Sequence, residues 1–241
     1  MIKLIVKGKI HGKDIKYMRQ LCSSNNLQSI DLSQAQIVAN STFSYYQDYK
    51  TTKDVLGDYT FYNLNKLVSV VMPQSITKIG SWAFSSTGLK IVDIPDKVTS
   101  IGGDAFSYCD NLNTVIIGSG MKTLAQGVFY NSNVKDVYVK PLTPPSISGY
   151  LFTSKPTIHV YKSALDKYKA SAWAEYGTIV GDLTDEIIDG IQTPSDSPVK
   201  GRTEPLPSRG GREGSFDLMG RRVTTPKPGG IYIRNGRKII M

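Results

Sequence analysis

The stretch that decides the fold is LKIVDIPDKVTSIGGDAFSYC, residues 89–109. Its second half, VTSIGGDAF at 98–106, nearly repeats ITKIGSWAF at 76–84. Aligned on its first apolar residue, the unit recurs at intervals of 22, 23 and 22 residues. A phrase that returns in phase at such an interval indicates a chain that folds the same unit repeatedly. The units open at Leu67, Leu89, Leu112 and Val134.

Each unit contains a strand, a turn and an Ala-Phe pair whose side chains fill the core. In the strand L-x-x-V/I-x-I/M, positions 4 and 6 point to one side and positions 3 and 5 to the other. Pro73 and Pro95 end the strand, and Gly80 and Gly102 suit a close backbone approach. One such unit cannot bury its own apolar side, but stacked units can. The predicted core consists of Leu67, Val70, Met72, Ile79, Phe84, Leu89, Val92, Ile94, Ile101, Phe106, Leu112, Val115, Ile117 and Phe129.

The same unit resembles the BspA-like leucine-rich repeats of anaerobic bacteria, whose pattern is L-x-x-I-x-I-P-x-x-V-T-x-I-G-x-x-A-F-x-x-C. Residues 89–109 match it almost throughout, 67–84 well, 112–129 moderately, and 134–147 in the strand alone. The resemblance implies a leucine-rich repeat right-handed solenoid of stacked parallel β-strands with short helices and turns, a β-rich α/β fold. It further implies export to the cell surface and binding rather than catalysis, typically as an adhesin toward host matrix proteins or other bacteria.

This resemblance extends over residues 1–183, with a capping element at each end. The N-terminal cap is expected to combine an atypical first turn with a short helix, and a Tyr-rich insertion follows near 38–58. At the other end, TIHVYKSALDKYKASAWAEYGTIVGDL is expected to form a strand, a helix capped by Ser163 and a final strand. The Pro/Gly-rich residues 184–214 predict a linker, and residues 215–241 predict a small three-stranded β segment.

The C-terminal part differs from the rest in charge. Residues 190–241 hold ten Lys/Arg against four Asp/Glu, whereas residues 1–189 hold nineteen against sixteen, so most of the net charge of +9 lies in the tail. Within 216–241, FDLMGRRV followed by PGGIYIRNGRK resembles the C-terminal sorting signal of type IX secretion, which implies an exported protein. The start, MIKLIVKGKI, lacks the roughly 7–15-residue apolar segment of a signal peptide. We therefore expect an extracellular or cell-surface protein whose signal has been trimmed.

Residues that would support catalysis are scarce. The two histidines, His11 and His159, each lie in or beside a predicted strand, without an HExxH motif, paired cysteines or another metal spacing. The sequence therefore predicts no catalytic residue, no metal site and no cofactor. Basic residues of the tail alternate with apolar strand residues and lack a set of stacking aromatic rings, which argues against a nucleic-acid partner. No apolar run reaches the roughly 20 residues of a transmembrane helix.

Two features are candidates for ligand binding. In the insertion, Tyr45, Tyr46 and Tyr49 either recognise a ligand or pack against the solenoid, and both interpretations stay open, whereas Tyr59 and Phe61 are assigned to packing. The other feature is the exposed side of the strands at positions 3 and 5, where apolar residues form a partner site or merely favour strands. These strand positions hold Ser69, Val71, Ile91, Asp93, Thr114, Ile116, Asp136 and Tyr138.

Two hypotheses for function follow. The first is a non-catalytic, adhesin-like and monomeric interaction module that binds protein or glycan ligands on host or bacterial surfaces. The second is a surface hydrolase or its accessory domain, which requires a pocket where His11 or His159 meets a carboxylate and a nucleophile. Cys22 and Cys109 lie three turns apart by the repeat count, roughly 14 Å along the stack, so both are predicted to be free thiols.

Overall fold

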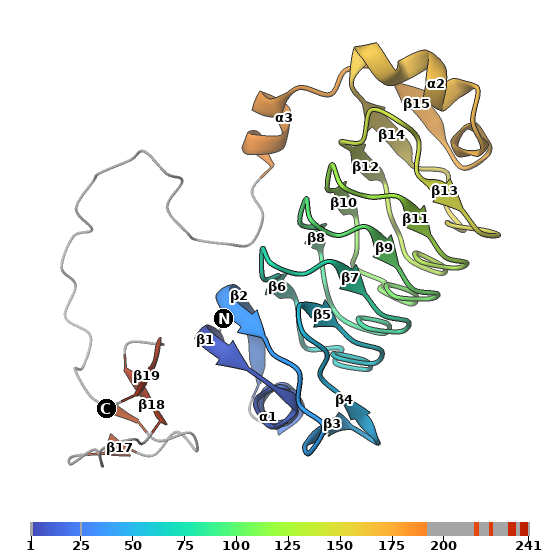
Figure 1. The fold of residues 1–241 in the computed structure, drawn as a ribbon. Helices are drawn as coiled ribbons and strands as arrows, with labels where there is room; N and C mark the ends of the chain where they lie inside the picture. The colour runs from blue at the N-terminus through green and yellow to red at the C-terminus, as the bar shows by residue number, and fades with distance from the viewer. Residues whose placement is uncertain are drawn as a thin grey trace.

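The computed structural model describes residues 2–24 and 26–191, together with four short strand segments between residues 215 and 240. Successive coils of the chain stack between an N-terminal and a C-terminal cap (Figure 1). Each central coil gives one strand to each of two parallel sheets on different sides of the stack. The fold is the predicted leucine-rich repeat solenoid.

The first sheet of the solenoid has the strand order β15-β14-β12-β10-β8. All its strands are parallel, and successive strands pair in register, for example Val115 with Val92 on one side and with Val137 on the other. Its members are β8 (Ile91–Asp93), β10 (Thr114–Ile117), β12 (Asp136–Val139), β14 (Thr157–Val160) and β15 (Thr178–Val180). The strand β6 (Ser69–Val71) lies beside β8 and pairs with the N-terminal cap.

The second sheet comes from a part of each repeat where the sequence predicted no strand. The I-T-x-I-G phrase, or the segment at its place in the coil, forms a two-residue strand, and five such strands pair in parallel in the order β13-β11-β9-β7-β5. A coil is therefore a flattened loop with two strands rather than one. The members are β5 (Val55–Leu56), β7 (Lys78–Ile79), β9 (Ser100–Ile101), β11 (Thr123–Leu124) and β13 (Ser146–Ile147).

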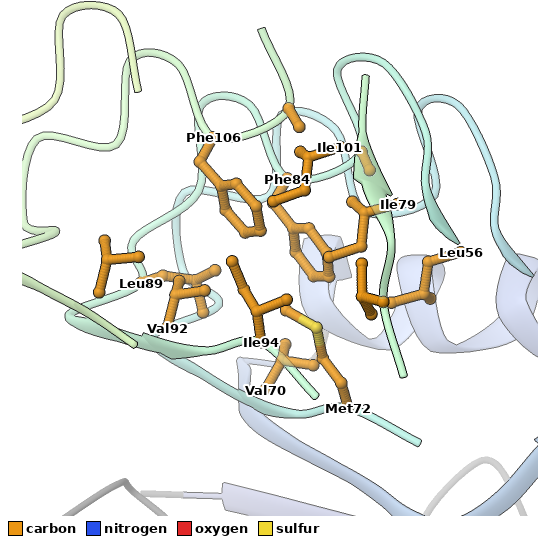
Figure 2. Close-up of a cluster of buried hydrophobic side chains, with 14 of the residues drawn as sticks. Leu56, Val70, Met72, Ile79, Phe84, Leu89, Val92, Ile94, Ile101 and Phe106 are labelled. Atoms are coloured by element: carbon orange, nitrogen blue, oxygen red, sulfur yellow. The ribbon is translucent and has the colours of Figure 1, made fainter. Parts of the chain in front are cut away.

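The core fills the space between the two sheets, and the predicted core is confirmed. All fourteen predicted residues are buried, from 0% exposed for Phe106 to 8% for Val70. Figure 2 shows how aliphatic side chains from neighbouring coils surround the phenyl rings. Those rings form a ladder of Phe61, Phe84, Phe106, Phe129 and Phe152, with successive centroids 5.4, 5.0, 5.6 and 5.2 Å apart.

Backbone hydrogen bonds hold the coils in phase at the phenyl ladder. The N–H of Phe84 donates to the carbonyl of Ala105 at 2.7 Å, and the N–H of Phe106 donates to Val128 at 2.8 Å. The predicted close approach at the repeated glycine is also observed. A Cβ on Gly102 would lie 2.5 Å from the backbone nitrogen of Ser81 in the preceding coil, a distance that real side chains do not reach.

The caps close both ends of the core. The N-terminal cap contains β1 (Ile2–Ile10), α1 (Gly12–Ser24) and β2 (Leu27–Ile37), and β2 pairs with β6. The C-terminal cap has a 3-10 turn (Lys162–Ala164), α2 (Leu165–Lys169) and a second 3-10 turn (Ala172–Glu175). Trp173 and Tyr168 close the core there, and each donates a hydrogen bond to a proline carbonyl. The expected cap by Ser163 is wrong, because Ser163 lies inside the 3-10 turn and Tyr161 precedes it.

Both cysteines are buried free thiols, as predicted. Cys109 lies between coils, where its sulfur is 3.3 Å from Thr87 Oγ1 and 3.2 Å from the carbonyl oxygen of Phe84. Cys22 lies on the buried side of α1 in the N-terminal cap. Burial raises the pKa of the Cys22 thiol to about 12.

The boundaries of the insertion and the linker differ from those expected. The insertion contains a hairpin of β3 (Ser44–Tyr46) and β4 (Tyr49–Lys50), but its predicted end belongs to the first strand of the second sheet, β5. The start of the predicted linker forms α3 (Asp185–Gly190), whose first turn is capped by the Thr184 hydroxyl. Residues 192–214 of that linker lie outside the described residues.

Four strand segments are described in the tail, where three strands were expected: β16 (Ser215–Phe216), β17 (Arg222–Val223), β18 (Ile231–Arg234) and β19 (Arg237–Ile240). β18 and β19 pair antiparallel on either side of the predicted Asn-Gly turn, which itself lies outside the described residues. β19 also pairs in parallel with β1, at Ile5 and Arg237. The tail strands therefore extend the sheet of the N-terminal cap.

Candidate functional site on the strand face

The strand face is the outward side of the sheet β15-β14-β12-β10-β8. Because the strands are parallel and in register, side chains at equal positions of the repeat line up in rows across the sheet. The repeat thus brings residues more than twenty positions apart in the chain into neighbouring places. One row holds Asp93, Ile116, Tyr138 and His159, and the next holds Ile91, Thr114, Asp136 and Thr157.

Burial separates the predicted strand-face residues into two groups. Two of them are only 1% exposed, Ser69 and Ile116, so the expectation that they contact a ligand is wrong. Ile116 lies on β10 between Asp93 of β8 and Tyr138 of β12, and Ser69 pairs with the buried Ser29. The predicted continuous apolar patch is therefore interrupted. Val71, Ile91, Asp93, Thr114, Asp136 and Tyr138 all retain exposed surface.

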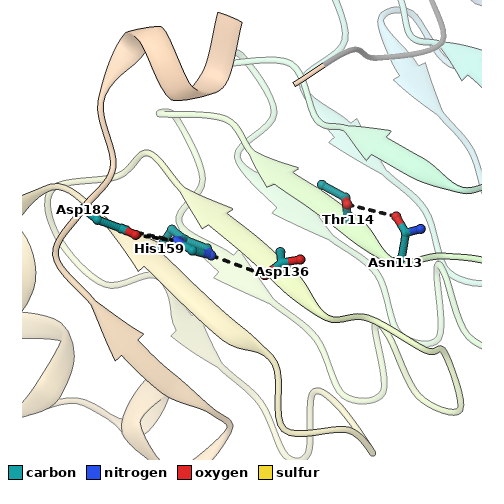
Figure 3. A network of polar contacts seen from close by, with 5 residues as sticks. All are labelled: Asn113, Thr114, Asp136, His159 and Asp182. Atoms are coloured by element: carbon teal, nitrogen blue, oxygen red, sulfur yellow. Dashed lines mark hydrogen bonds and ion pairs between the residues drawn. The ribbon is translucent and has the colours of Figure 1, made fainter. Parts of the chain in front are cut away.

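His159 is the centre of a polar network at one end of this face. Its ring stacks on Tyr138, with centroids 4.4 Å apart and planes 12° from parallel. Its Nδ1 lies 2.9 Å from Asp182 Oδ1, and its Nε2 lies 3.4 Å from Asp136 Oδ1. Figure 3 shows the imidazole between the two carboxylates, with Thr114 and Asn113 further along the face. The network therefore fixes one aromatic pair and two carboxylates in a single arrangement.

Further carboxylates lie outside this network, with Asp93 on β8, Asp96 shortly after it and Asp185 in α3. Burial raises the pKa of Asp93, and the attraction of Lys140 opposes that rise. Burial also acts to raise the pKa of Asp96, but hydrogen bonds from Lys140 Nζ at 2.9 Å and from the Ser119 N–H lower it below its usual value. The hydroxyl of Tyr161 donates to Asp185 at 2.7 Å. Carboxylates are therefore spread along the face, from Asp93 on β8 to Asp182 after β15.

Sequence reasoning missed His159 as part of this site and treated it as a structural or surface histidine. The missed signal is the repeat itself, because T-I-H-V at 157–160 aligns with D-V-Y-V at 136–139. That alignment places His159 in the row of Tyr138, which was predicted. Asp182 was not among the predicted binding residues.

The two histidines lie in separate surroundings, His11 beside α1 and His159 on the strand face. His11 Nδ1 accepts a hydrogen bond from the Lys13 N–H at 3.2 Å and lies 3.5 Å from Asp14 Oδ2, and its ring stacks on Phe43. It lines a cavity of about 740 Å³ between β1, α1 and the insertion. Within residues 2–24 and 26–191, no hydroxyl or thiol forms a hydrogen bond with the ring of His11 or His159. The pairing of histidine, carboxylate and nucleophile that the hydrolase hypothesis requires is not assembled at either ring.

The three insertion tyrosines have different environments. Tyr45 is 3% exposed, and its hydroxyl donates to the carbonyl of Asp58 at 2.8 Å, so its assignment as a ligand contact is wrong. Its ring packs in the core because the hairpin folds back over α1. Burial raises the pKa of Tyr45 to about 12. Tyr46 and Tyr49 are half-buried, and each keeps part of its ring at the surface.

Among the described residues, no three His, Cys, Asp or Glu side chains are grouped as metal ligands. The helices in the described part of the chain are too short or too polar to span a membrane.

The fold and this face define a leucine-rich repeat solenoid. Residues 48–159 match the family model of the BspA type leucine rich repeat region, in six copies. Leucine-rich repeats of this kind suggest a protein-interaction module. A crystal structure of a leucine-rich repeat protein from Bacteroides ovatus aligns at 14% identity over 66% of this chain and 63% of that chain, with a TM-score of 0.32. No curated protein matches the sequence.

Proposed function

We propose that this chain is a non-catalytic, adhesin-like interaction module that acts at the cell surface and binds a protein partner through its strand face. The repeat type supports binding as the general role. The observation that carries the proposal is the network of Tyr138, His159, Asp136 and Asp182, because it fixes ring faces and carboxylates where a partner can reach them. A structural role alone does not require two carboxylates, each more exposed than the ring, around one imidazole that is 15% exposed.

The chemistry of this network favours a partner segment that contains Arg or Lys. A guanidinium forms paired hydrogen bonds with a carboxylate and stacks on an aromatic face. Tyr138 and His159 provide the rings, and Asp136 and Asp182 provide the acceptors. The apolar side chains of Val71 and Ile91 continue the surface toward the N-terminal cap. The face therefore combines an acidic aromatic end with an apolar end.

The insertion tyrosines extend this proposal to a second contact region. Tyr46 and Tyr49 retain exposed ring surface beside α1 and are proposed to contribute to recognition at that end. Export follows from the sorting-signal resemblance of residues 216–241 and is proposed together with an extracellular location and a monomeric state. Glycan and bacterial-surface ligands remain part of the proposed range.

The proposal is tested with the full chain against a panel of immobilised matrix proteins and glycans. For a protein that binds, the dissociation constant is measured for the wild type, Tyr138→Ala, Asp136→Asn and Asp182→Asn. We expect Tyr138→Ala to weaken binding at least tenfold and each Asp variant to weaken it several-fold, with less difference at high salt.

The matched control is Tyr108→Ala, which removes a 44% exposed tyrosine from the turn between β9 and β10. This variant is expected to bind like the wild type. Unchanged affinity in all three face variants, or an equal loss in the control, would contradict the assignment of the strand face.

A further inference from the structure

A second surface lies away from the strand face, on the turns that follow the second strand of each coil, where Tyr59, Trp82 and Asp104 are half-buried. These turns form the loop flank. Equivalent positions of its successive coils hold Tyr59, Trp82, Asp104 and Gly127. The backbone N–H of Trp82 donates to Gly103 of the next coil at 3.0 Å, and the N–H of Asp104 donates to Gln126 at 3.1 Å. The four residues therefore form a ladder along the solenoid, separate from the network at His159.

All four positions have left-handed backbone conformation, with φ of 58° at Tyr59, 57° at Trp82, 55° at Asp104 and 70° at Gly127. Glycine adopts this conformation without cost, and Asp tolerates it, but a bulky aromatic residue is strained there. The last coils place Gly127 and Gly149 at this conformation. Two neighbouring coils nevertheless carry large rings at this position, which is unusual for a residue with only a structural task.

The rings at these strained positions form an ordered platform. Tyr59 and Trp82 stack with their ring centroids 6.4 Å apart and planes only 4° from parallel, and Tyr46 also stacks on Tyr59, with centroids 5.7 Å apart. Tyr62 stands nearly perpendicular to both Tyr59 and Trp82, at 87° and 83°. Trp82 is the end of the stack, because the next coil has Asp104 in place of a ring. Among the described residues, no aromatic ring stacks on the far side of the indole.

The base of this platform is rigid. Arg19 of α1 donates from Nη1 to the carbonyls of Tyr59 and Thr60, both at 3.0 Å, and from Nη2 to Tyr62 at 3.2 Å. Its guanidinium also lies 4.5 Å from the ring centroid of Tyr46. The turn that carries the stacked rings is thereby tied to the N-terminal cap. Little conformational entropy remains to be lost when a ligand binds there.

Two hydrogen-bonding groups at this end of the platform have no partner among the described residues, the Asp104 carboxylate and the indole N–H of Trp82. The Asp104 carboxylate leans over Gly127, because a Cβ on that glycine would lie 2.6 Å from Asp104 Oδ1. In the described part of the chain, no side chain or N–H donates to this carboxylate, and desolvation raises its pKa. The indole N–H of Trp82 likewise has no acceptor there, in contrast to Trp173, whose indole donates to Pro145. Among the described residues, an acceptor on one coil and the indole donor on the preceding coil are therefore both left without a partner, and the indole ring itself is half-buried.

From this arrangement we infer that Trp82 and Asp104 form a binding subsite for a sugar ring of a neutral oligosaccharide. The face of an aromatic ring is electron-rich and attracts polarised C–H groups, which a pyranose presents at the centre of its face. The hydroxyls at the edge of the sugar both donate and accept, so they match the carboxylate and the indole N–H together. A Lys or Arg side chain has no acceptor and leaves the indole N–H unpaired.

The two tryptophans of the chain make this subsite directly measurable. Trp173 is only 1% exposed, so a change of tryptophan emission on adding a soluble ligand reports Trp82. The full chain is first screened on an array of neutral oligosaccharides. Each sugar that binds is then titrated in solution. Cellohexaose, chitohexaose and maltohexaose are titrated whatever the result of the array. We expect a saturable emission change that is the same at 0.05 M and 0.5 M salt.

Variants distinguish binding at this subsite from non-specific binding elsewhere on the protein. We expect Trp82→Ala to weaken sugar binding at least tenfold and Asp104→Ala to weaken it several-fold, while Tyr108→Ala, an exposed ring elsewhere on the turns, leaves it unchanged. Melting temperatures confirm that the variants are folded, and Trp82→Gly is a second variant that relieves the backbone strain at the same position. The inference is overturned if no neutral sugar changes the tryptophan emission or if Trp82→Ala binds sugar as the wild type does. It is also overturned if salt abolishes binding, because a salt-sensitive site fits a cationic peptide rather than a neutral sugar. Because the strand-face variants leave Trp82 in place, failure of this inference is distinguishable from failure of the proposed function.

Discussion

Replacing Phe106 by alanine tests the idea that every coil is a layer of one continuous core. Phe106 is 0% exposed and lies between Phe84 at 5.0 Å and Phe129 at 5.6 Å, both nearly parallel to it. Removing a buried phenylalanine costs about 3–5 kcal/mol. Because two ring contacts of about 0.5–1.5 kcal/mol each are lost as well, we expect a value near the upper end of that range.

The assay is a urea titration of the wild type and Phe106→Ala, followed by circular dichroism. With a urea dependence of about 2 kcal/mol per molar, the loss corresponds to a midpoint shift of about 2 M. Tyr108→Ala, two residues further on and 44% exposed, is the control and should cost less than about 1 kcal/mol. A loss below about 1 kcal/mol in Phe106→Ala would refute the layered core.

The position of Phe106 in the middle of the stack adds a second readout. Trp82 lies on the N-terminal side of the substitution and Trp173 in the C-terminal cap. Single-tryptophan variants, Trp82→Phe and Trp173→Phe, report the unfolding of the two ends separately. In the wild type both should unfold at the same urea concentration, whereas Phe106→Ala should separate the two transitions, because each coil is stabilised by its neighbours.

Three further predictions concern the caps, the glycines and the thiols. Arg19→Ala removes three hydrogen bonds from the guanidinium and should cost about 2–3 kcal/mol in the same titration, whereas Lys16→Ala on the exposed side of α1 should cost almost nothing. Gly102→Ala places a Cβ 2.5 Å from the Ser81 nitrogen and should lower the melting temperature by several degrees, while Gly103→Ala, with 3.3 Å to its nearest atom, should lower it much less. Because the pKa of the Cys22 thiol is raised to about 12, this thiol should not react with a disulfide reagent at pH 8 until urea unfolds the protein. In the folded protein its reactivity should appear only as the pH approaches 12. Rapid reaction of the folded protein at pH 8, or a linked Cys22–Cys109 peptide in non-reduced mass spectra, would contradict this prediction.

The repeat pattern was sufficient for the core because burial in a solenoid depends on position within the coil. Phe84 and Phe106 occupy the same place in their units, so one alignment predicts both. The second strand escaped prediction because a two-residue strand such as Ser100–Ile101 is too short to show a periodicity. The helix at Asp185–Gly190 was missed although its capping residue Thr184 and the following Asp185 and Glu186 are a typical helix start.

The candidate site was less predictable than the core because it depends on neighbours rather than on the unit alone. Ile116 and Tyr138 hold the same position in consecutive coils, yet Ile116 is buried and Tyr138 keeps exposed surface. The carboxylate that holds His159 comes from Asp182, beyond the last strand of the repeat pattern. No pattern within one unit reports a contact made by the C-terminal cap.

The in-phase hydrogen bonds between coils have a mechanical consequence. A pulling force along the stack acts on the contacts of the outermost coil first, because each coil contacts only its neighbours. Releasing one coil of 22 residues frees about 70–75 Å of extended chain, while the remaining coils keep their own bonds, such as that from Phe106 to Val128. The molecule should therefore lengthen in steps of one coil, each step dissipating energy before the next begins. Extension of this kind shields what is attached at either end from a sudden load.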